Sequence, residues 1–152
     1  MPILSRTTTP EIDPAELGDG YSRVDVEFEG VEHGGSTYEG RVYVNNPDAD
    51  ADTEQTLEQG YAGSYYVFGH GGCYGDQGHC DVVRRSPYDP RAPHGLTPTR
   101  KVVIATEAVR KAVAGGGNLT VTVVPVLKST TEKVPEDEAL PDFKAVSLIS
   151  YQ

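Results

Sequence analysis

The chain alternates apolar and polar residues over several short stretches. From residue 21 to 29, valine or phenylalanine alternates with charged side chains, and the alternation resumes over residues 38–45. A period of two is typical of a strand with one buried face. The intervening His33-Gly34-Gly35-Ser36 has the composition of a turn. We therefore expect two consecutive strands that form a hairpin.

Four further segments carry strand signals. Residues 61–68 are rich in aromatic and β-branched side chains, residues 101–105 form a β-branched run, and residues 144–151 alternate again. Residues 118–127 are apolar on both faces, which is typical of a strand buried on both sides. We expect this last segment to be central in its sheet, and residues 144–151 to form an edge.

One segment has a helical pattern instead. Apolar residues recur at helical spacing between Thr106 and Val113, and Gly115-Gly116-Gly117 follows them. Thr106 is a residue type that caps helix N-termini, and three glycines end a helix. The sequence therefore predicts one short helix.

Strands of this number with a single helix and no repeated strand–helix–strand units predict an all-β fold. We expect a mainly antiparallel β-sandwich, jelly-roll-like, with one short helix. Residues 1–20 are predicted to form an N-terminal arm, residues 21–127 the sandwich domain, and residues 128–152 a charged linker with a C-terminal strand.

Composition narrows the classes of partner. The chain has 152 residues, with 13 basic and 23 acidic side chains and a net charge of −10. An acidic surface argues against nucleic acid, whose binding needs a basic face. No apolar run approaches the roughly 18 residues of a membrane span, and the first residues lack a signal-peptide pattern. We expect a soluble chain, while the sequence leaves the compartment open.

The chemistry of the chain is concentrated in residues 69–80, which hold both cysteines and two of the four histidines. Cys73 and Cys80 admit three interpretations. They can form a disulfide that closes a glycine-rich loop. They can join His70 and His79 in a copper or zinc site, since thiolate and imidazole suit these metals. They can also be reduced thiols without a chemical role.

Three stretches of the chain resemble a known family. They are Arg41-Val42-Tyr43-Val44-Asn45-Asn46-Pro47, Tyr61-Ala62-Gly63-Ser64-Tyr65-Tyr66-Val67-Phe68-Gly69-His70, and Leu119-Thr120-Val121-Thr122-Val123-Val124-Pro125-Val126. Over residues 21–127 the chain resembles the β-sandwich domain that follows the catalytic domain in tyrosinases, polyphenol oxidases and molluscan haemocyanins. That resemblance implies a sandwich packed over a type 3 dicopper centre. In some members a cysteine pair is linked to copper delivery.

The chain departs from that family in its histidines. The resemblance implies that a type 3 copper centre needs two sets of three histidines, mostly on a helical bundle, whereas this chain has only His33, His70, His79 and His94. We therefore expect that it is not the oxidase itself.

Two functions follow as hypotheses. The first is a non-catalytic accessory subunit or chaperone that docks on a dicopper oxidase, covering its active site or aiding copper delivery. Its candidate copper ligands are Cys73, Cys80, His70 and His79. Its candidate partner contacts are Tyr65, Tyr66, Phe68, Tyr74, Arg84 and Arg85.

The second hypothesis is a structural protein whose sandwich self-associates into a homo-oligomer. Its arm and last strand would pair with neighbouring copies, and a disulfide between Cys73 and Cys80 would staple the loop.

Overall fold

The computed structural model describes residues 1–71, 77–78, 80–82, 84, 86–90, 95–129, 134 and 136–152. The strands are β1 (Ile3–Leu4), β2 (Thr7–Thr8), β3 (Arg23–Val31), β4 (Thr37–Val44), β5 (Tyr61–Val67), β6 (Thr99–Ile104), β7 (Val121–Ser129), β8 (Ala139–Leu140) and β9 (Ala145–Tyr151). The helical elements are α1 (Thr106–Ala114) and the short 3-10 helices η1 (Pro14–Leu17) and η2 (Leu57–Gln59).

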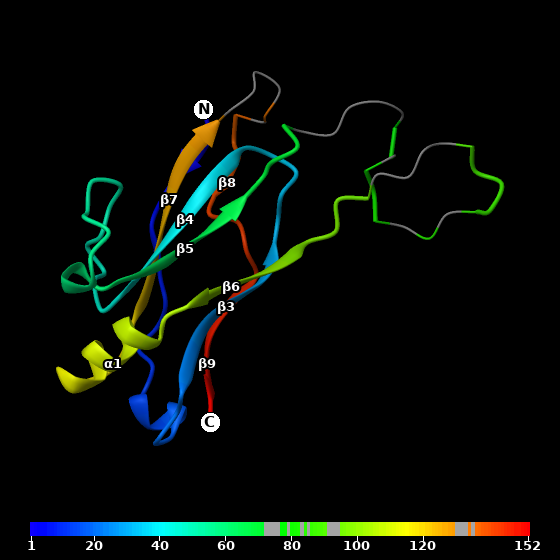
Figure 1. Ribbon diagram of the computed structural model, residues 1–152. Helices are drawn as coiled ribbons and strands as arrows, with labels where there is room; N and C mark the ends of the chain where they lie inside the picture. The colour runs from blue at the N-terminus through cyan, green and yellow to red at the C-terminus, as the bar shows by residue number, and fades with distance from the viewer. Residues whose placement is uncertain are drawn as a thin grey trace.

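The strands form two main sheets. One has the order β2-β7-β4-β5 and the other the order β6-β3-β9, and all pairings within them are antiparallel. A parallel pair, β1 with β8, lies beside them. Figure 1 shows α1 at one end of the sheets. The prediction of an all-β fold with one short α-helix is thus confirmed for the described residues.

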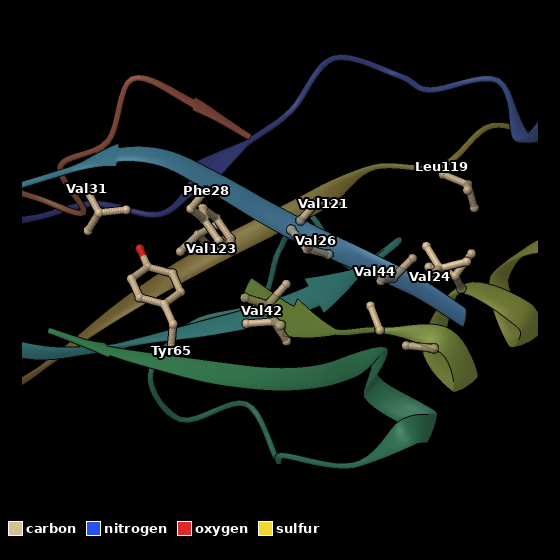
Figure 2. Packing of buried hydrophobic residues seen from close by; sticks show 14 of the residues in the cluster. Val24, Val26, Phe28, Val31, Val42, Val44, Tyr65, Leu119, Val121 and Val123 are labelled. Atoms are coloured by element: carbon tan, nitrogen blue, oxygen red, sulfur yellow. The ribbon is translucent and has the colours of Figure 1, made fainter. Parts of the chain in front are cut away.

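The core lies between the two sheets. Val24, Val26 and Phe28 of β3 face inward, because alternate residues of a strand point to the same side. They pack against inward-facing residues of β4 and β7, which include Val42, Val44, Val121 and Val123. Figure 2 shows these side chains filling the space between the strands. Burial of these apolar side chains is the main favourable contribution to folding.

The predicted hairpin is wrong. β3 belongs to the three-stranded sheet and β4 to the four-stranded sheet, so the turn at residues 32–36 crosses from one sheet to the other. Alternation correctly identified Val24, Val26 and Phe28 as the core-facing residues of β3, although Asp25 and Glu27 on the opposite face are also buried. It carries no information about whether two such strands pair edge to edge or pack face to face.

α1 packs on the sandwich through Ala108 and Val109, both buried. Its N-cap is Ala105 rather than the predicted Thr106. Instead, the Oγ1 atom of Thr106 accepts a hydrogen bond of 3.1 Å from the backbone N–H of Val24. Within the described ranges, neither α1 nor another helix has the length and apolar content to cross a bilayer.

Strands from the chain ends complete the sheets. β2 from the N-terminal arm pairs with β7, β1 pairs with β8, and β9 pairs with β3 along its whole length. The arm and the C-terminal segment therefore form part of the same folded body as residues 21–127. β9 is the last strand of its sheet and presents its other side as an edge.

Tyr65 of β5 reaches across the core between the sheets. Its ring centroid lies 4.6 Å from that of Phe28 on the opposite sheet. The ring occupies the space beside Gly40 of β4, where a Cβ atom would overlap it. Glycine at this position therefore makes room for the aromatic contact that joins the two sheets.

We expect Gly40→Ala to lower the free energy of unfolding by about 1–3 kcal/mol, because the added methyl must displace the Tyr65 ring in a packed core. Urea unfolding followed by circular dichroism measures the change. Gly34→Ala is the matched control, since a Cβ there would meet only Leu96 Cδ1 at an ordinary 3.5 Å. Equal stabilities of the two variants would contradict this view of the core.

Candidate functional site at the end of strand β5

β5 turns two aromatic side chains to the outside of the four-stranded sheet. Tyr66 is 51% exposed and Phe68, one residue beyond the strand, is 77% exposed. Tyr65 between the sheets is only 3% exposed. Tyr66 and Phe68 are therefore accessible to a partner, as the predicted contact role requires. The prediction that Tyr65 contacts a partner is wrong, because its side chain belongs to the core.

A charged cluster lies beside Tyr66 on the same outer face. Glu39 of β4 is the register neighbour of Tyr66. Its carboxylate accepts a hydrogen bond from Ser64 Oγ at 2.7 Å and forms ion pairs with Lys128 Nζ at 2.8 Å and Arg41 Nε at 3.3 Å. Aromatic and arginine side chains side by side are typical of the energetic centres of protein interfaces.

The cluster holds Glu39 in its charged form. Burial alone would raise the pKa of Glu39, but the hydrogen bonds from Lys128 and Ser64 and the charge of Arg41 outweigh it. The pKa therefore lies below its ordinary value of 4.5. The carboxylate is 4% exposed, so its cationic partners replace the water that it has lost.

His70 follows β5 and meets His33 of the turn between β3 and β4. The Nδ1 atoms of the two rings are 3.3 Å apart. The cluster of cysteines and histidines in the sequence pointed to His70 but not to His33, which lies 37 residues earlier. No local pattern reveals such a pair, because the antiparallel pairing of β4 with β5 places the turn before β4 beside the segment that follows β5.

The other predicted site residues fall in the connection between β5 and β6. Arg84 is exposed. Cys80 is disulfide-bonded, and its carbonyl oxygen accepts a hydrogen bond from the backbone N–H of Leu96. Cys73, Tyr74, His79 and Arg85 lie outside the described residues. The pairing of Cys73 with Cys80 therefore stays a prediction.

The predicted copper site also stays a prediction. Two of its four ligands, His70 and Cys80, are described, and the described part of the chain contains no group of three or more potential ligands arranged around a metal. A disulfide sulfur supplies no thiolate, so a metal role for Cys80 requires the bond to be reduced first.

Comparison with protein-family models, curated proteins and solved structures finds no match to this chain. The likeness to the tyrosinase-family sandwich therefore rests on the three quoted stretches.

We expect the wild-type free energy of unfolding to fall as the pH drops below 4.5, the ordinary pKa of glutamate. A carboxyl whose pKa is lowered by folding stabilises the native state above its unfolded pKa and loses that contribution in acid. Glu39→Gln should cost about 1–3 kcal/mol at neutral pH. The difference from wild type should shrink in acid, where Glu39 is protonated.

Chemical denaturation across this pH range measures the effect. Glu107→Gln is the control, because Glu107 is 74% exposed in its ion pair with Arg110 and such pairs contribute less than about 1 kcal/mol. A deficit of Glu39→Gln that stays constant down to acid pH would show that the carboxylate charge is not what stabilises the cluster.

Proposed function

We propose that this chain is a non-catalytic accessory β-sandwich that docks on a type 3 dicopper oxidase of the tyrosinase kind. The observation that carries the proposal is the pair of outward-facing aromatic side chains, Tyr66 and Phe68, at the end of β5. Aromatic side chains bury large areas and dominate the energetics of protein interfaces. A solvent-exposed phenylalanine gains this free energy only when a partner covers it.

The neighbouring polar groups supply the specificity that such an interface needs. Arg41 and Lys128 are anchored to Glu39, so their side chains are already ordered before a partner arrives. Ordering side chains in advance reduces the entropy cost of association. The aromatic pair and the neighbouring charged cluster together make up the proposed docking surface, which we define by Glu39, Arg41, Ser64, Tyr66, Phe68 and Lys128.

The choice of partner follows from the resemblance. In the tyrosinase family the sandwich packs over the dicopper domain, and the β-sandwich architecture of this chain is what that likeness requires. This chain has four histidines in all, so a dicopper centre would have to come from the partner. Copper delivery by His70, His79, Cys73 and Cys80 is part of the same proposal, after reduction of the cysteines.

We expect the double variant Tyr66→Ser/Phe68→Ser to bind the catalytic chain of such an oxidase at least about tenfold more weakly, because exposed aromatic anchors concentrate binding energy. The oxidase used as the binding partner is one encoded in the genome that encodes this chain. Surface plasmon resonance measures the affinity, and thermal melting checks that the variant remains folded.

The matched control is Val102→Ser/Ile104→Ser on β6. These side chains are 42% and 57% exposed but belong to the other sheet. The control should bind like the wild type. Loss of binding in the control with retention in the β5 variant would move the interface to the three-stranded sheet and overturn the assignment.

Self-assembly is the second candidate, and the edge of β9 favours it. This strand has seven residues, and a long edge strand is a template for pairing with another chain. The arm strands β1 and β2 pair within their own chain, so assembly would rely on β9.

Sedimentation velocity over a range of concentrations tests the assembly. A homo-oligomer that Ser147→Lys/Ile149→Lys dissociates would support it, because lysine on an edge strand opposes pairing. A monomer at all concentrations would exclude it.

A further inference from the structure

The histidine pair joins two segments that are distant in the sequence. His33 lies in the turn after β3, and His70 lies just beyond β5. Their ring centroids are 5.0 Å apart with an angle of 60° between the planes, and the Nδ1 atoms face each other at 3.3 Å. Neither residue takes part in the docking surface, so the pair needs a separate explanation.

Backbone contacts hold the two segments together independently of the rings. The N–H of His70 donates to the carbonyl of His33 at 3.1 Å, and the N–H of Gly71 donates to that of Gly35 at 2.9 Å. The approach at Gly69 is so close that a Cβ atom there would overlap the Gly35 carbonyl oxygen. The rings are therefore placed by the fold rather than by their mutual attraction.

The contact of His33 with Thr97 fixes the tautomer of the His33 ring. Its Nε2 lies 2.7 Å from the carbonyl oxygen of Thr97. Since a carbonyl can only accept, Nε2 carries the proton, and the neutral ring presents the Nδ1 lone pair toward His70. A histidine that binds a metal usually donates its other ring N–H to a carbonyl or carboxylate in this way.

The Nδ1 atom of His70 lies close to two atoms of His33. This atom is 3.0 Å from the His33 carbonyl oxygen and 3.3 Å from His33 Nδ1. In the metal-free protein the Nδ1–H donates to that carbonyl. In the other neutral tautomer, with the proton on Nε2 instead, Nδ1 presents a second lone pair beside that of His33.

The separation of the two nitrogens matches a tetrahedral ion. Two ligands at Zn–N distances of about 2.0–2.1 Å in tetrahedral geometry stand about 3.3 Å apart. We propose that His33 and His70 bind Zn²⁺ through their Nδ1 atoms, with solvent completing the coordination. The ion replaces the hydrogen bond from His70 to the His33 carbonyl, and the His70 ring changes tautomer by exchange with solvent.

The surrounding charge favours a cation. On the turn that carries His33, a cavity of about 710 Å³ is lined by the acidic residues Glu32, Asp137, Glu138 and Asp142. Clustered carboxylates create a negative potential that raises the local concentration of cations. The carboxylates are not ligands in this proposal.

Bound Zn²⁺ links the β3–β4 turn to the start of the β5–β6 connection. An ion that binds only the folded chain stabilises it by mass action. It therefore raises the melting temperature of the chain. This role does not depend on docking, and each can fail without the other.

Isothermal titration of the full chain with Zn²⁺ tests the proposal. The cysteines are left unreduced, so that they offer no thiolates. The variants His33→Gln and His70→Gln remove each Nδ1 ligand, and in His33→Gln the new side-chain amide keeps an N–H donor near the Thr97 carbonyl. His79→Gln is the control, because His79 belongs to the predicted cysteine-loop site but not to this pair. Thermal melting without metal verifies that each variant folds.

We expect one Zn²⁺ per chain, an affinity at least about tenfold weaker in both His33→Gln and His70→Gln, and wild-type affinity in His79→Gln. Nitrogen-15 NMR of the ring atoms should place the metal-induced shift on Nδ1 of both histidines. Wild-type affinity in His33→Gln, or a shift on Nε2 instead of Nδ1, would overturn the proposal.

Discussion

The Tyr65 side chain, wedged between the sheets beside Gly40, sets the geometry of the rest of the structure. Its contact with Phe28, at 4.6 Å between ring centroids, ties β5 to the opposite sheet. Because strand residues alternate in direction, burying Tyr65 turns Tyr66 and Phe68 outward. The pairing of β5 with β4 places the end of β5 against the β3–β4 turn, where His70 meets His33. The docking surface and the histidine pair therefore both depend on the position of β5.

Periodicity predicted the strands well and their partners poorly. Alternation in residues 21–29 and 38–45 identified β3 and β4 and the inward face of β3, but a buried face is equally compatible with a hairpin and with two packed sheets. Adjacent Tyr65 and Tyr66 look equivalent in sequence. Only the register of β5 against β4 decides that the first is core and the second is surface. The sequence does not identify His33 as the neighbour of His70 for the same reason, since the register of β5 against β4 brings the two histidines together.

The outer face of the four-stranded sheet combines a buried charged cluster with exposed aromatic side chains. The buried Glu39 with its cationic partners gives that face a fixed charge pattern, while Tyr66 and Phe68 supply apolar area that water covers poorly. Exposed aromatic side chains contribute little to the stability of the isolated fold, but they stabilise a complex when a partner covers them. The proposed accessory role has this requirement, because a non-catalytic sandwich acts only through the chain that it covers.

Hydrogen–deuterium exchange of this chain, alone and with the proposed dicopper oxidase partner, tests the docking proposal. We expect slower exchange on binding in residues 64–69, which form the end of β5 and the residues after it, and in the adjoining residues of β4. Exchange in β9 and β6 should be unchanged, because they belong to the other sheet. Protection confined to the three-stranded sheet, or no protection under saturating conditions, would contradict docking through the four-stranded sheet.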